Sequence, residues 1–380
     1  MVFANRAGEA AGAPVRSGEA PVLSLLVPVY NVRSYLEESL ASACAQSLAD
    51  IEIVCIDDGS TDGSADILRA RAERDARIRV ISKENTGYGD SMNRGLAAAR
   101  GEFVGILEPD DLACADGLRA LVAAARKAGA DLAKGNFERY WSVPRVRTAP
   151  VRVVPANRCG KALRPRDDAT IFSCEPSIWS AVYRRSFLED NGIRFLPTPG
   201  ASFQDCSFAF KVLASAERAV YVNRAVVRYR QDNESSSVKA PDKAFCTCGE
   251  YAEIERWIGC EFAARHGEAE AVRLLRAAQV AKYDSYMWSY VRLAPELRAP
   301  FLDRMAREFA RDLDAQTVSL ADFRPWKRAN LEAIVRDPEL WLKRYPGYAT
   351  AGSLGRMVHY LRLGGPGLVA SYALGRLRHG

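Results

Sequence analysis

Short apolar runs alternate with longer amphipathic stretches from Val22 to about Phe137. The apolar runs are rich in Leu, Ile and Val on both faces, which is typical of strands buried on both sides of a sheet. We predict strands at 23–29, 51–56, 78–82, 102–107 and 131–137, and helices at 35–47, 64–74, 91–99 and 117–128. This alternation predicts an α/β fold with a mostly parallel central sheet and helices on both faces.

After residue 137 the pattern becomes irregular and then mainly helical. Segment 140–168 carries many Arg and Pro residues, which favours irregular loops with a few edge strands. Order returns with a predicted strand at 179–183, a helix at 185–191 closed by Gly192, a helix around 203–216 and strands within 219–231. Beyond about residue 239 the spacing is almost entirely helical, so we expect an α-helical C-terminal region.

Four of the predicted strands end in polar or acidic segments. In a parallel α/β sheet, the ligand crevice lies outside the carboxyl ends of the strands. These ends read Pro28-Val29-Tyr30-Asn31, Asp57-Asp58-Gly59-Ser60, Glu84-Asn85-Thr86-Gly87 and Glu108-Pro109-Asp110-Asp111. Each segment alone would suit an ordinary turn, but together they predict an acidic ligand site at one edge of the sheet.

The acidic segment 108–111 has two interpretations. Mg²⁺ and Mn²⁺ prefer oxygen ligands, and Mg²⁺ commonly uses one or two carboxylates together with substrate phosphates. Taken alone, however, an Asp after a strand is more often a helix cap. A dinucleotide motif is excluded for the nearby Gly87 and Gly89, because the third glycine of that motif is replaced by Met92 and the segment follows the third strand.

Five ordered segments carry a family resemblance. They are LSLLVPVYN, DIEIVCIDDGSTDGS, NTGYGDSMNRGL, ARGEFVGILEPDD and SFQDCSFAFKV. Together they resemble glycosyltransferase family 2, whose members have the A-type nucleotide-diphospho-sugar fold and invert the anomeric centre. The resemblance covers about Val22 to Ser237 and does not extend into the helical C-terminal region.

The resemblance implies roles for individual residues. Tyr30 would lie near the base, Asp58 would bind a pyrimidine, Asp110 would lie near the ribose or the metal, and Asp111 would ligate Mn²⁺ or Mg²⁺. The full nucleotide-sugar set is Pro28, Tyr30, Asn31, Asp58, Asn85, Gly87, Asn93 and Asp110. Asp205 matches the family's catalytic base, which takes the proton of the acceptor hydroxyl as that hydroxyl attacks the anomeric carbon. The alternative for Asp205 is an N-cap of the helix that follows.

The chain departs from the family pattern at several positions. Glu108 stands where many members have Asp, Gln204 stands where Glu is common before the base, and Met92 replaces an Arg before Asn93. No His follows the base where some members have a metal ligand, and Arg230 in that stretch is a candidate diphosphate contact. Four aromatic residues could stack on an acceptor sugar or belong to the core: Trp141, Trp179, Tyr183 and Phe203.

Composition limits the number of domains and the class of protein. The 380 residues predict about two domains, and 48% hydrophobic with 26% charged residues is typical of an ordinary globular protein. We expect a flexible tail at 1–21, a catalytic domain at 22–238, a helical region at 239–340 and a basic amphipathic tail at 341–380. Nine dispersed cysteines without a CxxC pair, and the lack of an export signal, favour reduced thiols and a cytoplasmic location.

The net charge of +6 is a property of the last forty residues. Segment 341–380 has six basic and no acidic residues, so the remainder of the chain is formally neutral. Nucleic acid is therefore not an expected partner. Leu354, Met357, Val358 and Leu361 share one helical face in this segment, which predicts contact with an anionic membrane surface on the inner face of the cell membrane. The alternative is that these helices pack on the catalytic domain.

Together these observations predict an inverting, metal-dependent glycosyltransferase. It would move a sugar from a nucleotide-diphosphate sugar, with a UDP-sugar favoured, to a hydroxyl of a glycan or a lipid-linked glycan in bacterial surface polysaccharide assembly. The alternative is a non-catalytic, glycosyltransferase-like scaffold subunit. A nucleotidyltransferase is disfavoured, because the loop after the first strand, VPVYNVRSYLEES, lacks the glycines and the basic cluster that grip a triphosphate.

Overall fold

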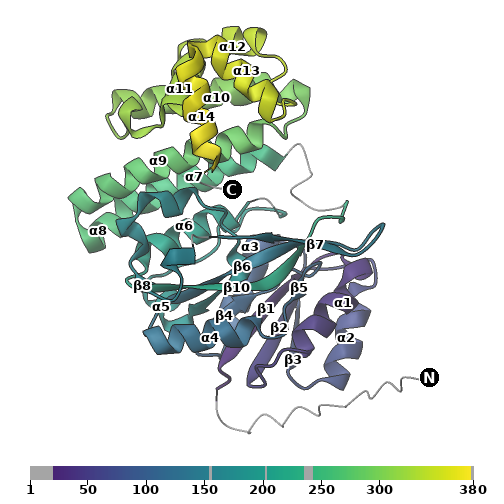
Figure 1. Ribbon diagram of the computed structural model, residues 1–380. Helices are drawn as coiled ribbons and strands as arrows, with labels where there is room; N and C mark the ends of the chain where they lie inside the picture. Colours follow the sequence, from purple (N-terminus) through teal and green to yellow (C-terminus); the bar gives the residue numbers. More distant parts are fainter. Residues whose placement is uncertain (1–19, 154–155, 202, 235–242, 378–380) are drawn as a thin grey trace. The chain divides into compact units, whose positions relative to one another are not determined.

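The computed structural model describes residues 20–153, 156–201, 203–234 and 243–377 (Figure 1). Contacts divide the chain into two compact units. The first consists of Met1–Leu163, Ser177–Arg194 and Glu217–Asp232, and the second consists of Arg164–Pro176, Phe195–Ala216 and Asn233–Gly380. The domain limits expected at 238 and 340 would divide the chain into consecutive segments, whereas each of the two units combines three separate segments of the chain. The expected tail at 1–21 lies almost wholly outside the described residues.

The first unit is built on a mixed sheet. Over the described residues its ten strands have the order β3-β2-β1-β4-β9-β6-β10-β5, with β7 beside β6 and β8 beside β10. The strands are β1 Leu23–Val29, β2 Ile51–Asp57, β3 Ile78–Ser82, β4 Phe103–Ile106, β5 Leu112–Ala113, β6 Leu132–Trp141, β7 Arg147–Val151, β8 Ala162–Leu163, β9 Ala181–Arg184 and β10 Ala219–Arg230. Pairing among β3, β2, β1 and β4 is parallel, as predicted, and β9 introduces antiparallel pairing with β4 and β6.

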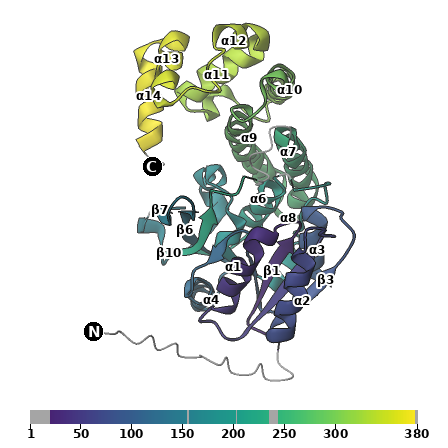
Figure 2. The ribbon, with the colours of Figure 1, turned by 90° about the vertical axis from the view of Figure 1, so that its right-hand side faces the viewer.

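Helices cover both faces of the parallel half. They are α1 Arg33–Cys44, α2 Ser64–Arg74 and α3 Tyr88–Ala98, followed by α4 Gly117–Ala128 and the short α5 Arg185–Asp190. The chain steps from β1 to β2 to β3 and then returns past β1 to β4. Because such crossovers are right-handed, α3 lies on the opposite face from α1, and Figure 2 shows the two helices on either side of β1. The predicted α/β class is therefore confirmed.

The register places the ends of these strands at one edge. Val29 is paired with Asp57, and Asp57 with Ser82, so β1, β2 and β3 end side by side. Pro28 fits inside β1 because pairing with β4 ends at Leu26, so no β4 carbonyl needs the amide hydrogen that proline lacks. The predicted convergence of the loops after these strands is present.

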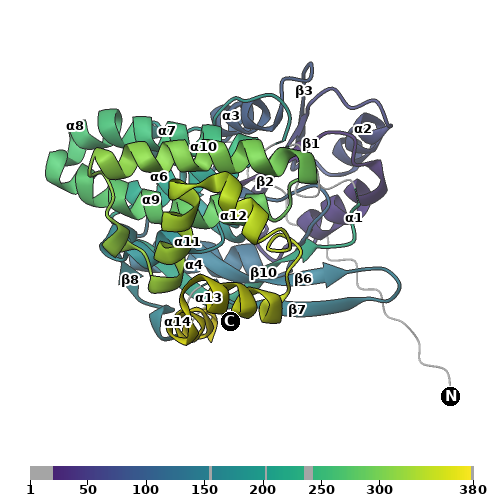
Figure 3. The same ribbon diagram turned by 90° about the horizontal axis from the view of Figure 1, so that it is seen from above.

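The second unit is helical. Its helices are α6 Asp205–Ser215, α7 Cys246–Trp257, α8 Ala263–His266, α9 Glu268–Tyr290, α10 Pro295–Asp314, α11 Pro325–Arg336, α12 Pro338–Arg344, α13 Ser353–Gly364 and α14 Pro366–Leu377. Helices α7, α9 and α10 have nearly aligned axes (Figure 3) and bury aromatic residues such as Tyr286 and Phe309 between them. The expected α-helical C-terminal region is confirmed. None of the described helices is long and apolar enough to cross a membrane.

Candidate active site

The loops after β1 and β2 are tied together by side chains. The Asn31 Oδ1 atom accepts the backbone N–H of Thr61 at 2.8 Å, and the Ser60 Oγ atom accepts the N–H of Asn31 at 3.2 Å. Asn31 has a φ of 50°, a left-handed conformation that Asn tolerates better than most residues. Tyr30, just before it, leaves 49% of its surface exposed. This edge therefore presents an aromatic ring on an ordered loop.

Asp58 holds the loop between β3 and α3. Its Oδ1 atom accepts the N–H of Thr86, and its Oδ2 atom accepts the N–H of Gly87, each at 3.0 Å. The Lys83 ammonium group also contacts Oδ1. Gly87 has a φ of 98°, which a residue with a side chain rarely adopts. The carboxylate of Asp58, which is buried, thus orders the segment that contains the candidates Asn85 and Gly87.

The acidic loop after β4 contains three carboxylates in different surroundings. The Glu108 Oε1 atom accepts the Tyr88 hydroxyl at 2.7 Å, and Asp110 is half-buried. Asp111 is completely buried, and its Oδ1 atom accepts the backbone N–H of Arg230 at 2.8 Å. Burial and the nearby charge of Asp110 raise the pKa of Asp111 well above its usual range. Asp111 is therefore destabilised as an anion unless further positive charge reaches it.

Arg230, the last residue of β10, stabilises this loop through hydrogen bonds. Its Nε atom donates to the Asp110 carbonyl at 2.7 Å, Nη1 donates to the Ser142 Oγ atom at 2.9 Å, and Nη2 donates to the Glu38 Oε2 atom at 2.6 Å. The side chain is only 1% exposed. With each guanidinium nitrogen donating within the first unit, Arg230 orders the acidic loop through its backbone.

A divalent cation fits the donor set of Asp110 and Asp111. The Asp111 Oδ2 atom is buried and has no hydrogen-bond partner in the described parts of the chain. No group of three or more His, Cys, Asp or Glu side chains could hold a metal ion by itself, as far as the described residues reach. Mg²⁺ does not need such a cage, because diphosphate oxygens commonly complete its shell. The orphaned oxygen is the kind of atom that a cation would satisfy.

Asp205 belongs to the second unit, whereas the nucleotide and metal candidates belong to the first. It is half-buried and opens α6. On the neighbouring helix α7, the Glu250 Oε2 atom accepts the backbone N–H of Ser207 in the first turn of α6 at 3.1 Å. Burial raises the pKa of Glu250 to about 7, and the charge of Asp205 adds to the effect. Asp205 therefore has a second carboxyl group beside it that the motif did not indicate.

The remaining candidates are placed as follows. Asn93 is half-buried in the second turn of α3. Trp179 stacks on Tyr229 with ring centroids 5.0 Å apart, and the buried Tyr183 donates its hydroxyl to the Ile178 carbonyl at 2.7 Å. Trp179 and Tyr183 are thus part of the core, which was the alternative considered for them.

Sequence reasoning missed four residues that shape these surroundings: Glu38, Lys83, Tyr88 and Glu250. Lys83 and Tyr88 lie within or beside a recognised motif, so their positions offered a signal. Glu38 and Glu250 lie on helices with many other charged residues. Nothing local distinguished them.

Comparison with known sequences identifies related proteins. Residues 24–192 match the family described as "Glycosyl transferase family 2". The chain is 30% identical over 233 residues to "Uncharacterized glycosyltransferase EpsJ" of Bacillus subtilis, a match that covers 59% of this chain and 64% of EpsJ. It is 26% identical over 234 residues to "Cholesterol galactosyltransferase" of Borreliella burgdorferi, which covers 58% of this chain and 64% of that protein. Each match spans less than two thirds of the relative's length.

Solved structures share the fold. The crystal structure of S. aureus TarS 1-349 superposes with a TM-score of 0.64 at 20% identity, and the match covers 86% of this chain and 91% of that one. The same fragment in complex with UDP-GlcNAc gives a TM-score of 0.50 at 19% identity, covering 83% and 91%. At this level of identity the likeness concerns the fold, and it extends well beyond residues 24–192.

Proposed function

We propose that the chain, whose residues 24–192 match the family described as "Glycosyl transferase family 2", transfers a sugar from a UDP-sugar to a hydroxyl of a glycan or lipid-linked glycan, inverting the anomeric centre. The observation that carries this proposal is the ordered edge of the first unit. There the loops after β1, β2, β3 and β4 meet and are fixed by Asn31, Asp58 and Arg230. This edge would bind the donor.

The nucleotide would lie along these loops. The half-exposed ring of Tyr30 offers a stacking surface for a base. A carboxylate has about four lone-pair sites, so Asp58 could accept a pyrimidine N–H in addition to its present donors. We assign the rest of the pocket to Pro28, Asn31, Asn85, Gly87, Asn93 and Asp110. The structure of TarS with UDP-GlcNAc makes a uridine nucleotide the first donor class to test.

Asp110 and Asp111 would hold Mn²⁺ or Mg²⁺ together with the donor diphosphate. When bound, the cation neutralises charge that develops on the departing nucleotide. Arg230 keeps the loop in place by contacting its backbone. Addition of EDTA is expected to abolish transfer, and Mn²⁺ or Mg²⁺ to restore it. Full activity in EDTA would remove the cation from the proposal.

Asp205 would act as the base. In an inverting transfer, the acceptor hydroxyl attacks the anomeric carbon from the face opposite the nucleotide while one carboxylate takes its proton. Since the leaving diphosphate needs no separate proton donor, one such carboxyl group is enough. Asp205 is half-buried at the start of α6, so its carboxylate is partly accessible.

The test is a screen of nucleotide sugars for transfer or hydrolysis with Mn²⁺, comparing wild type with Asp205→Asn. The variant should bind nucleotide normally but lose at least about 100-fold in kcat, the usual scale for removal of a general base. Asp66→Asn, which changes an exposed carboxylate paired with Arg69, is the matched control and should behave as wild type. Normal turnover by Asp205→Asn would refute the assignment of Asp205 as the base. Inactivity of the wild type with every donor would favour the alternative of a non-catalytic scaffold subunit.

We also propose that the acceptor is met at an anionic membrane surface. Leu354, Val358 and Leu361 lie on one face of α13 and are 76%, 40% and 51% exposed. The opposite face carries His359 and Tyr360, which are buried. The predicted apolar stripe of α13 therefore points away from the helices on which α13 packs.

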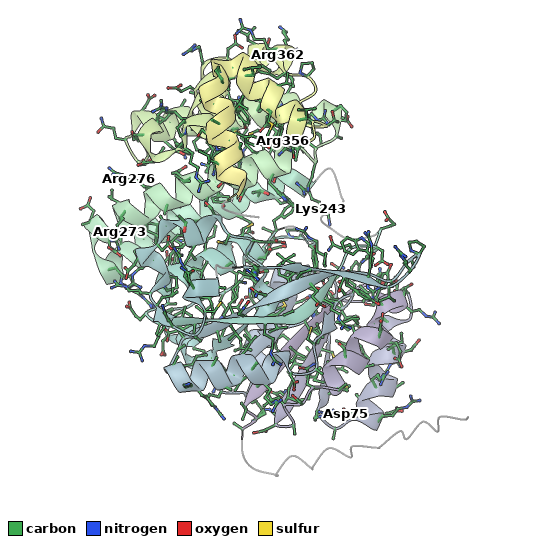
Figure 4. All side chains as sticks on the ribbon, in the orientation of Figure 1. Asp75, Lys243, Arg273, Arg276, Arg356 and Arg362 are labelled. Carbon is green, nitrogen blue, oxygen red and sulfur yellow. The ribbon has the colours of Figure 1, made fainter. Side chains whose placement is uncertain are left out.

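Charge indicates what would cover this stripe. From residue 340 to 377 the described chain has no carboxylate side chain. Arg362, which follows Leu361 on α13, is exposed (Figure 4). Basic and apolar residues on one surface suit anionic headgroups over acyl chains. Leu354→Ser/Val358→Ser/Leu361→Ser should lower binding to vesicles of phosphatidylcholine with phosphatidylglycerol, whereas Val146→Ser/Val272→Ser, at exposed sites elsewhere, should not. Equal binding by all variants, or binding to pure phosphatidylcholine alone, would refute the contact.

A further inference from the structure

The residue before α6 does not cap this helix with its side chain. The first N–H groups of a helix have no partner inside the helix and need an acceptor from elsewhere. Gln204, just before the helix, turns its side chain away: its Nε2 atom donates to the Thr198 Oγ1 atom at 2.8 Å and to the Gly200 carbonyl at 3.1 Å. The Phe203 carbonyl accepts the N–H of Cys206 at 3.0 Å, and the next N–H group, that of Ser207, takes its acceptor from another element.

Helix α7 supplies this acceptor. The Glu250 Oε2 atom accepts the N–H of Ser207, two residues after Asp205, at 3.1 Å. Glu250 is only 1% exposed, so its carboxyl group is fixed by its surroundings. A carboxylate near a helix N-terminus also interacts favourably with the helix dipole. The contact connects the position of Asp205 to a residue 45 places later in the chain.

We propose that Glu250 is a positioning residue for Asp205, holding the first turn of α6 and placing a second carboxyl group beside the base. This inference rests on the proposed function, in which Asp205 is the base. It assigns to α7, beyond the segment that matches the family, a part in setting the geometry and the pH range of the transfer.

The charged groups around Glu250 support a direct electrostatic effect. Burial raises the pKa of Glu250 to about 7, Asp205 raises it further, and Lys211 on α6 lowers it. The Cys206 thiol between them stays neutral, because burial and both carboxylates raise its pKa well above the usual range.

Charged groups on the other elements packed against α7 have partners of their own. Lys282 on α9 contacts Glu255, and the Nζ atom of Lys243 donates to the Ala201 carbonyl. Asp284, also on α9, pairs with Lys327. Asp205 is thus the neighbouring carboxylate whose charge acts on Glu250.

The experiment compares Glu250→Gln and Glu250→Ala with wild type in the full chain, by pH profiles of kcat/KM with UDP-sugar and Mn²⁺. Gln keeps an acceptor for Ser207 but removes the charge. Because the pKa of Glu250 is about 7, its carboxyl group is neutral on the acidic limb and charged only at higher pH, where the charge makes Asp205 a stronger base. Glu250→Gln should therefore keep the wild-type acidic limb but lose the rise in kcat/KM near pH 7, with kcat below pH 7 within about threefold of wild type. Ala removes the acceptor too, and kcat should fall about tenfold while KM for the donor stays within about twofold.

Glu253→Gln is the matched control, three residues along the same helix. The Glu253 Oε1 atom accepts Lys211 Nζ at 2.6 Å, a contact between the same two helices away from the first turn of α6. Its pH profile should keep the rise near pH 7. Retention of this rise in Glu250→Gln, or its loss in Glu253→Gln as well, overturns the inference. Circular dichroism and melting temperatures identify loss of folded protein, and an unchanged kcat in the folded fraction of Glu250→Ala also counts against it.

The two proposals fail in different ways. If Asp205→Asn is fully active, the assigned base is wrong whatever Glu250 does. If Asp205→Asn is inactive and Glu250→Gln keeps the rise in kcat/KM near pH 7, only the positioning role is wrong.

Discussion

Arg230 in the first unit and Lys282 in the second are both buried cations, with side chains 1% exposed, but they are held differently. The Lys282 ammonium group lies among three carboxylates, with distances of 2.7 Å to Glu255, 3.0 Å to Glu308 and 3.2 Å to Asp312. Those carboxylates belong to α7 and α10, while Lys282 belongs to α9. A compact cation thus joins three helices.

Arg230 donates to two neutral oxygens and one carboxylate, and its Nη1 atom also lies 3.6 Å from the Asp232 carboxylate. Its guanidinium group reaches the Asp110 carbonyl and the Ser142 hydroxyl, and its carboxylate partner at hydrogen-bond distance, Glu38, is 52% exposed. The rigid fork of Arg can hold several oxygens in fixed directions, which an ammonium group cannot do in the same way. The difference indicates that Lys282 balances charge in a core, whereas Arg230 shapes a loop whose carboxylates would serve a ligand.

The largest expected effect is the loss of Lys282. Lys282→Met leaves three carboxylates close together, with Asp312 buried and Glu255 and Glu308 half-buried. Removing one partner from a buried ion network typically costs about 3–5 kcal/mol. We expect a loss of this size in the free energy of unfolding, measured by urea titration followed by tryptophan fluorescence. Lys343→Met is the control, since Lys343 is 75% exposed and lies 3.4 Å from Glu339; it should change stability by less than about 0.5 kcal/mol. Equal stability of the two variants would show that Lys282 does not balance the cluster.

Arg230→Lys should produce a smaller loss of stability but a clear loss of donor binding. Lys keeps the charge but cannot reach the Asp110 carbonyl, Ser142 and Glu38 together, so we expect about 2–3 kcal/mol of destabilisation. A loosened acidic loop should weaken UDP binding in the presence of Mn²⁺ by at least about tenfold, as measured by calorimetry. Lys282→Met, tested under conditions where it is folded, should bind UDP like wild type. Normal UDP binding by Arg230→Lys would remove Arg230 from the donor site.

The sequence predicted the first unit well because its strands are continuous apolar runs. Strand β3 and helices α2 and α4 have the predicted limits. The strand predicted at 179–183 is shifted to β9, because Ile178–Ser180 forms a 3₁₀ turn in which Ser180 Oγ donates to the Ser177 carbonyl at 2.9 Å. A local turn of this kind competes with strand propensity and leaves no apolar pattern.

The candidate site was predicted as a set of loops but not as a network. The motifs indicated Asp58 and Asp111, yet Asp58 is held by amides 28 and 29 residues away, and Asp111 by an amide 119 residues away. Arg230 and Glu38 are separated by 192 positions. Periodicity and motif spacing report local structure, so partners at such separations follow only from the folded chain.

His359, a buried side chain of the second unit, tests how strongly burial opposes the formation of a charge there. His359 Nε2 lies 3.0 Å from Asn330 Oδ1, and its Nδ1 atom has no hydrogen-bond partner in the described chain. Burial, with the charge of Arg356, lowers the pKa of His359 to about 4. The unfolded chain, with an ordinary His pKa near 6.5, binds the proton more readily, so this residue makes stability fall as the pH drops from about 6.5 to 4.

At pH 5 the loss due to His359 should be about 2 kcal/mol relative to pH 7.5, from the difference between the two pKa values. The measurement is the free energy of unfolding at both pH values for wild type and His359→Gln. Other groups titrate equally in both proteins, so the variant should lose about 2 kcal/mol less between the two pH values. Identical pH dependence would mean that His359 is protonated without penalty.

The smallest expected effect comes from a variant that distinguishes the carboxylate partner of Arg230, Glu38, from its neutral partners. Glu38 is exposed, so solvent screens its attraction to the guanidinium group, and Glu38→Gln should cost less than about 1 kcal/mol. If neutral oxygens fix the acidic loop, UDP affinity should remain within about twofold of wild type, because Gln can still accept the Nη2 hydrogen. A tenfold loss of affinity in Glu38→Gln, reproduced in wild type by 0.5 M NaCl, would instead show that the ion pair fixes the loop. In that case Arg230 would resemble Lys282 after all, as a cation held by charge.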